Sequence, residues 1–177
     1  MVDGTDQQLL RRFSRGDRAA FDEFYGRHAR GLFFYLHGVL SDADAAADVL
    51  QDLFHDMCRD AERFAGAENL QAYLFQACRN LAMAFQRGQA RSRRRQEQWH
   101  AHRLLRRVDS SGPEEIERAE ALSRMLQKLP LEQREVVLLR VYQELEFSVI
   151  AEVTGVARDT LYKRFHAALS ALREHIR

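Results

Sequence analysis

Residues that interrupt helices are scarce in this sequence. Only two prolines and nine glycines occur among its 177 residues, and long alternating runs of β-branched side chains are missing. Proline and glycine are the residues that helix interiors tolerate least, whereas the common residues of this chain, Ala, Leu, Arg and Glu, are compatible with helices. The composition therefore predicts an all-α fold, and a hydrophobic content of 46% is enough for a packed core.

Cysteines and long apolar stretches are also scarce. Cys58 and Cys78 are the two cysteines, and they form neither a CxxC pair nor a zinc-binding spacing. No stretch approaches the roughly 18 apolar residues that cross a bilayer, and residues 1–8 are too polar for a signal peptide. We therefore expect reduced thiols, no metal, no membrane insertion and a cytoplasmic protein.

Sequence motifs typical of enzyme active sites are missing as well. The sequence has no Ser/His/Asp, HExxH or phosphate-loop pattern, and its histidines show no ligand spacing. We expect that the protein is not an enzyme and needs no cofactor.

The formal net charge is only +1, which excludes general attraction to polyanions, but the charges are unevenly distributed. Residues 86–107 carry eight arginines against one acid, whereas residues 42–60 carry six aspartates against one arginine. Contacts with DNA or with a basic partner are therefore expected from local patches.

Residues 145–172 have the pattern of a helix, a turn and a second helix. Ile150 and Val153 would pack the first helix, and Leu161 begins the apolar face of the second. Gly155 falls at the turn, where a positive φ favours glycine. This pattern predicts a helix-turn-helix that places its second helix in the DNA major groove. The alternative is an ordinary helical hairpin whose charged face is solvated.

Capping residues predict where the preceding helices begin. Asp17 is a good N-cap for a long second helix, and Ser41 is expected to cap the third, with Asp44 three positions later as in a capping box. Residues 63–69 are expected to form a loop, after which Asn69 caps a fourth helix.

Aspartates recur at steps of four residues along the expected third helix. These are Asp44, Asp48, Asp52, Asp56 and Asp60. Such neighbours form a slowly winding ridge, and each like-charged pair costs a few tenths of a kcal/mol. A solvated helix face is one interpretation. Solvated faces usually mix charges of both signs, however, so a ridge of one sign favours a basic protein partner.

The chain divides into two small helical domains joined by a flexible linker. Residues 1–90 form the first predicted domain, residues 91–116 the linker, and residues 117–177 the second domain. The linker is arginine-rich and contains Ser110, Ser111, Gly112 and Pro113 as helix breakers.

Two separated stretches resemble one family. The segment LPLEQREVVLLRVYQELEFSVIAEVTGVARDTLYKRFHAAL resembles sigma region 4, and DAAADVLQDLFHDM followed by RFAGAENLQAYLFQACRNLA resembles sigma region 2. The order and the short linker resemble the extracytoplasmic-function (ECF) group of the sigma-70 family. The resemblance implies an initiation factor that binds the β′ and β subunits of core RNA polymerase. It also implies that the factor binds promoter DNA. An anti-sigma factor is a further partner that the resemblance implies.

The same resemblance implies roles for particular residues. The polymerase-binding set is Asp44, Asp48, Gln51, Asp52 and Asp56. The set for the melted −10 strand is Phe64, Asn69, Tyr73, Arg79, Asn80 and Arg87. Tyr73 could equally be a core residue. The set for the −35 duplex is Arg158, Thr160, Lys163, Arg164 and His166.

An alternative function is a helix-turn-helix transcriptional regulator whose first 90 residues sense a ligand or dimerise. In that case the aromatic face around Phe33 and Phe34 would line a pocket, and the protein would bind a two-fold operator as a dimer without polymerase.

Overall fold

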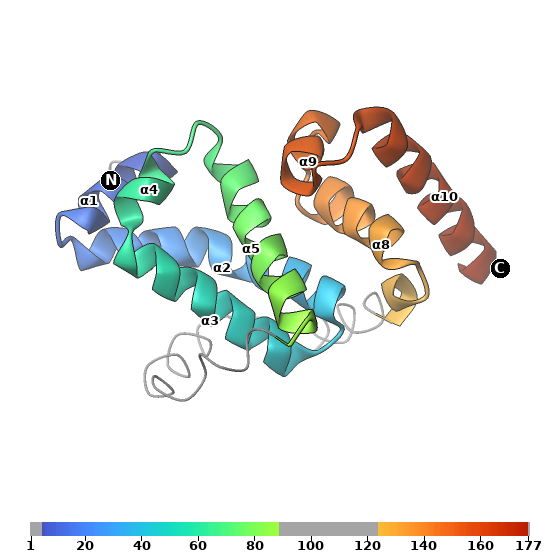
Figure 1. Cartoon of the computed structure of the whole chain (residues 1–177), viewed down its shortest axis with the longest axis horizontal. Coiled ribbons are helices and arrows are strands. Elements are labelled where there is room, and N and C mark those ends of the chain that lie inside the picture. The colour runs from blue at the N-terminus through green and yellow to red at the C-terminus, as the bar shows by residue number, and fades with distance from the viewer. Residues whose placement is uncertain (1–4, 89–123, 177) are drawn as a thin grey trace.

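The computed structural model describes residues 5–88, the N-terminal unit, and residues 124–176, the C-terminal unit (Figure 1). Every regular element in these two ranges is a helix, which confirms the predicted all-α fold. The predicted linker, residues 91–116, lies outside the described residues. The division into domains at residues 90 and 117 therefore stays a prediction.

Helix α2 is the centre of the N-terminal unit. The helices are α1 (Asp6–Ser14), α2 (Arg18–Leu40), α3 (Ala43–Arg59), α4 (Ala61–Ala65) and α5 (Leu70–Gln86). Helices α1, α3 and α5 all pack against α2, because its apolar positions recur around much of its circumference (Figure 1). Phe24, Tyr35 and Leu36 of α2 are fully buried in this core.

Two of the three predicted N-caps are confirmed. The carboxylate of Asp17 and the amide oxygen of Asn69 each accept a hydrogen bond from a first-turn amide, at 3.3 Å and 3.1 Å. The prediction for Ser41 is wrong, because Asp42 caps α3 with an acceptor distance of 2.9 Å. Ser41 instead ends α2 in a left-handed conformation with φ of 56°.

The loop predicted at 63–69 is shorter than expected. Helix α4 occupies residues 61–65, and the carboxylate of Asp60 accepts a hydrogen bond from the amide of Arg63 at 3.2 Å to cap it. This short helix places the ring of Phe64 in the core, where the side chain is buried. Only residues 66–69 remain between α4 and α5.

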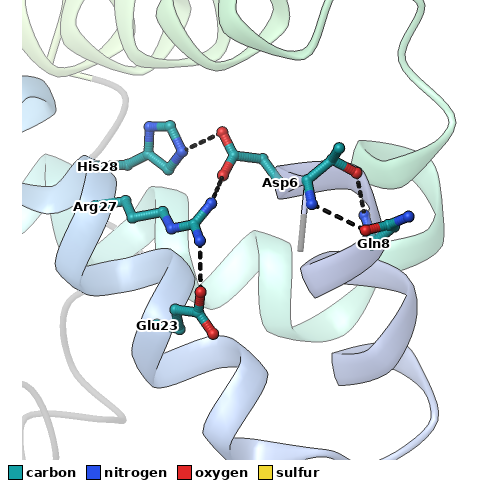
Figure 2. A network of polar contacts seen from close by, with 6 residues as sticks. Asp6, Gln8, Glu23, Arg27 and His28 are labelled. Carbon is teal, nitrogen blue, oxygen red and sulfur yellow. Dashed lines mark hydrogen bonds and ion pairs between the residues drawn. The ribbon is translucent and has the colours of Figure 1, made fainter. Parts of the chain in front are cut away.

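Helix α1 is fixed to α2 by a polar network at its first turn (Figure 2). Asp6 accepts from Arg27 at 3.1 Å and lies 2.8 Å from His28 Nε2, while Arg27 also pairs with Glu23. Gln7 donates to the carbonyl of Ala67 at 2.8 Å. The first turn of α1 thus also holds the short α4–α5 loop in place.

The C-terminal unit contains the predicted helix-turn-helix. A helical turn at 124–127 precedes α8 (Leu131–Val137), a π-helical segment η2 (Leu138–Tyr142), α9 (Phe147–Thr154) and α10 (Arg158–Ile176). Gly155 has φ of 71° between α9 and α10, which confirms the predicted turn. Ile150, Val153 and Leu161 are buried as expected.

The two units pack against each other around one continuous hydrophobic core. Helix α8 and η2 lie on α2, and α9 lies beside α5 (Figure 1). Phe34 of α2 packs on Tyr142 of η2, with ring centroids 4.8 Å apart. The aromatic face that a ligand-sensing domain would have used is therefore partly covered by the C-terminal unit.

Candidate protein and nucleic-acid interfaces

Helix α3 carries four of the five ridge aspartates on the side opposite its core residues, whereas Asp60 lies just beyond the helix and caps α4. Asp44 is exposed, whereas Asp48, Gln51, Asp52 and Asp56 are half-buried. Val49, Leu50, Leu53, Phe54 and Met57 of the same helix are buried. The predicted polymerase-binding residues therefore share one accessible helix face, and its charge is uniformly negative apart from Arg59 at the C-terminal end of the helix.

Phe64 and Tyr73 pack against each other near the start of α5. Their rings meet edge to face with centroids 5.1 Å apart, and Phe64 is only 1% exposed. Tyr73 is half-buried. Phe64 thus acts as a support beneath Tyr73, so of the two rings only Tyr73 is accessible to a base.

Asn69 and Arg79 are both engaged by glutamates of the C-terminal unit. Asn69 uses its oxygen to cap α5, and its nitrogen donates to Glu152 at 3.3 Å. Arg79 donates through Nε to Glu135 at 2.8 Å. Asn80 and Arg87, the remaining members of the predicted −10 set, are exposed.

Glu135 is the centre of a buried polar cluster that the sequence did not predict. It is 4% exposed and accepts hydrogen bonds from Arg79 and from the hydroxyl of Tyr35, each at 2.8 Å. Burial, followed by the nearby negative charge of Glu135, raises the pKa of the Tyr35 phenol well above its usual value. The phenol therefore stays protonated and remains a donor, and the cluster joins α8 to both α2 and α5.

Helix α10 presents the predicted −35 set on its outer face. Arg158, Thr160, Lys163 and His166 are exposed, and Arg164 is half-buried with Glu132 at 3.8 Å. Leu161 and Ala168 are fully buried on the inner side of the same helix. All five predicted residues therefore belong to one helix whose basic face is accessible to DNA.

An aromatic stack beside this helix was not among the predicted site residues. Tyr162, 46% exposed, stacks on Phe147 of α9 with centroids 4.0 Å apart. The guanidinium of Arg140 on η2 lies 5.6 Å from the Phe147 ring centroid. The stack is one of the contacts that hold α9 against α10.

The described residues contain no group of His, Cys, Asp or Glu that could hold a metal ion. Within those residues, no helix is both long enough and apolar enough to span a bilayer. Cys58 is exposed, Cys78 is buried, and both are free thiols.

Family models match both units. The model described as sigma-70 region 2 matches residues 24–92, and the model described as sigma-70, region 4 matches residues 119–172. The ECF RNA polymerase sigma factor SigM of Mycobacterium tuberculosis is 28% identical over 170 residues, which cover 95% of this chain and 83% of that protein. The RNA polymerase sigma-H factor of Pseudomonas aeruginosa is 27% identical over 191 residues, which cover 97% of this chain and 96% of that protein.

Two solved structures share the fold. CnrH, solved in complex with the cytosolic domain of CnrY, has a TM-score of 0.67 and 21% identity, covering 97% of this chain and 96% of that chain. The sigma factor RpoE of Bartonella quintana, solved with the anti-sigma factor NepR, has a TM-score of 0.64 and 20% identity, covering 87% and 94%.

Proposed function

Because this chain belongs to the ECF group of the sigma-70 family and is an RNA polymerase sigma factor, we propose specific roles for the surfaces described above. As a sigma factor it binds core RNA polymerase and directs promoter-specific initiation of transcription. Sigma factors are initiation factors and not enzymes. The functional side chains of this chain are therefore those that bind polymerase and promoter DNA.

The aspartate ridge of α3 is the proposed polymerase-binding surface. Its carboxylates lie on one accessible helix face, and they match a basic partner surface such as the β′ coiled coil expected from the family resemblance. Complementary charge speeds encounter and excludes wrong partners. The predominantly negative charge of this face is the observation that carries the proposal.

DNA binding is assigned to the other two surfaces. The exposed basic side chains of α10 would contact the bases and phosphates of the −35 duplex, where a bidentate arginine contact discriminates by about 1–3 kcal/mol. Helix α5 and the short loop before it would hold the unpaired −10 strand, with Tyr73 as the accessible ring near the start of the helix and Asn80 and Arg87 as accessible polar groups towards its end.

An anti-sigma factor is a further proposed partner. RpoE of Bartonella quintana was solved with one, and its fold is shared by this chain. A protein that covers α3 or α10 would block the surfaces assigned to polymerase and to the −35 element.

Charge reversal on α3 tests the polymerase-binding surface. We expect the double substitution Asp48→Arg and Asp52→Arg to weaken binding to core polymerase about 100-fold or more, because two attractive charge pairs become repulsive. The matched control, Asp22→Arg with Glu62→Arg, changes the net charge equally at two exposed carboxylates outside α3. Circular dichroism checks the fold of each variant. Equal polymerase affinity for the α3 variant and the control would refute this assignment.

A second pair of variants tests α10. Arg164→Ala should reduce promoter-dependent transcription while leaving the affinity for core polymerase unchanged. Arg173→Ala, an exposed arginine near the other end of the same helix, is the control. Equal transcription from both variants would argue against the proposed −35 contact.

A further inference from the structure

Tyr162 places an aromatic ring among the exposed charged side chains of α10. It is 46% exposed, whereas Phe165 of the same helix is half-buried. Arg158, Tyr162 and His166 follow one another at steps of four residues, so they form one row along the helix, and all three are exposed. An aromatic ring therefore stands in the middle of a row whose two ends are already assigned to the −35 duplex.

A second aromatic ring holds Tyr162 in place. Phe147 of α9 stacks on it, with centroids 4.0 Å apart and 29° between the ring planes. Phe147 is itself only 9% exposed, and Phe165 packs against it edge to face with centroids 5.7 Å apart. A side chain that is already ordered loses little rotamer entropy when it binds. The ring of Tyr162 is therefore preorganised for a contact outside the protein.

Arg140 connects this stack to the backbone that precedes α9. Its guanidinium lies 5.6 Å from the centroid of the Phe147 ring, donates to the carbonyl of Leu145 at 3.2 Å and lies 3.6 Å from a carboxylate oxygen of Glu146. Phe147 is buried and Arg140 is half-buried, so Tyr162 is the most exposed member of the stack. A ligand on this side of α10 would meet the tyrosine first.

The position of Tyr162 along the helix favours a contact with bases. It is the fifth residue of α10, which begins at Arg158. In a helix-turn-helix the N-terminal residues of the second helix contact base edges in the major groove. Side chains on a helix also lean towards its N-terminus, which brings the ring towards this leading end.

Thymine is the base whose chemistry fits an aromatic ring at this place. Its C5-methyl group is the apolar group that base pairs present in the major groove, and apolar side chains recognise thymine by contact with it. Phosphates are bound instead by charged side chains and hydrogen-bond donors, such as the neighbouring Arg158 and Lys163. The ring therefore matches a thymine methyl better than it matches a phosphate.

We propose that Tyr162 is a specificity-determining residue for the −35 duplex, and that its ring contacts the C5-methyl group of a thymine in the major groove. The proposal rests on the proposed function for the assignment of α10 to that duplex. It adds one base to that assignment, because the −35 element must contain a thymine that Tyr162 recognises. The basic side chains of the helix supply affinity, and the ring supplies selectivity at one position.

Selection of promoter variants by the complete holoenzyme tests which base the ring recognises. A genomic promoter that this protein transcribes with core polymerase is randomised across its −35 element, and the bound duplexes are sequenced. The proteins are wild type, Tyr162→Phe, Tyr162→Ala and the control Tyr142→Ala, which removes a 36% exposed ring of η2, outside α10. Wild type, Tyr162→Phe and the control should select thymine at one position. Tyr162→Ala should lose that preference and keep the others.

Three results of this selection would overturn the proposal. The first is a wild-type element without a selected thymine, or a thymine that Tyr162→Ala still selects. The second is an equal loss of the preference in Tyr162→Phe, which would assign it to the hydroxyl group. The third is a weaker affinity of Tyr162→Ala for core polymerase with an unchanged base preference, which would make the ring a protein contact.

Removing the methyl group from the DNA is the second measurement, and it needs no variant that must fold. Deoxyuridine in place of the selected thymine deletes the C5-methyl group and keeps every hydrogen-bonding group. Wild-type holoenzyme should bind this promoter about fourfold more weakly, which is the effect of burying one methyl-sized group. Deoxyuridine at a thymine outside both promoter elements is the control. Equal affinity of wild type for the two promoters would overturn the proposal.

The same pair of promoters separates recognition from a purely structural role of the ring. If Tyr162 only holds α9 against α10, Tyr162→Ala should weaken binding of both promoters and keep the difference between them. The proposal instead expects Tyr162→Ala to bind the two promoters equally. Failure of the protein to direct transcription from any promoter would refute the proposed function, and the thymine contact with it. Promoter-specific transcription that is indifferent to the methyl group would refute only the thymine contact.

Discussion

Replacing Arg79 alone by methionine should destabilise the chain more than replacing Arg79, Glu135 and Tyr35 together by apolar residues. The side chain of Glu135 is 5% exposed, and that of Arg79 is 28% exposed. Breaking a buried ion pair from one side costs about 3–5 kcal/mol, because a buried charge is left without its counterion. Water can reach the partly exposed Arg79 position, so we expect a loss of about 2–3 kcal/mol in the free energy of unfolding.

Replacing Glu135 and Tyr35 as well should restore most of the free energy of unfolding that Arg79→Met loses. With methionine at both 79 and 135 no buried charge remains, and the residual cost is the hydroxyl of Tyr35 without an acceptor, about 1–3 kcal/mol. Adding Tyr35→Phe removes that hydroxyl. The triple variant should therefore lie within about 1 kcal/mol of wild type, since buried ionic groups can often be replaced by apolar ones at little cost.

Urea denaturation followed by circular dichroism measures these differences. Arg87→Met, at an exposed arginine just after α5, is the control and should change stability by less than about 0.5 kcal/mol. The reasoning is refuted if Arg79→Met behaves like this control, or if the triple variant is no more stable than Arg79→Met alone.

Three local features of the fold can be tested by single substitutions or labelling. Gly155→Ala should cost about 1 kcal/mol, because φ of 71° disfavours any Cβ although the space around it is open, and calorimetry should show a Tm lowered by about 2–4 °C. Asp42→Ala should lower the free energy of unfolding, measured by urea denaturation, by about 1 kcal/mol because the N-cap of α3 is lost. Ser41→Ala should cost less, because Ser41 does not cap α3, and the reverse order would contradict the assignment. Iodoacetamide should modify Cys58 in the folded protein and Cys78 only after unfolding, because complete burial shields Cys78 and raises the pKa of its thiol; mass spectrometry of the native protein would detect any early reaction at Cys78.

Local signals in the sequence were sufficient for most helix boundaries. Asp17 and Asn69 each precede a helix and can accept a bond from its first turn, and Gly155 stands alone between two apolar patterns. The error at Ser41 has a physical reason. Ser41 and Asp42 are both good caps, and contacts from a distant residue distinguish them, because Arg134 donates to the Ser41 hydroxyl.

Of the candidate surfaces, those formed by a single helix could be predicted from the sequence, and those that depend on contacts between distant residues could not. The α3 ridge and the α10 face could be predicted because each is defined by spacing within a single helix. Arg79 and Asn69 were predicted as DNA-binding residues from the family resemblance, but their engagement by glutamates depends on how two units dock. Glu135 lies 56 residues from Arg79 and 100 from Tyr35, so no local pattern distinguishes it from a solvated surface charge. The pair Gly31 and Gly38, on one face of a long helix, was the available signal of close approach.

Run-off transcription on a fragmented genomic library tests the central claim most directly. Core polymerase supplemented with this protein should produce a set of discrete transcripts that core polymerase alone does not make. The sequences upstream of their start sites should share two conserved elements, near −35 and −10. A transcript profile identical to that of core polymerase alone would contradict the assignment of this chain as a promoter-specificity factor.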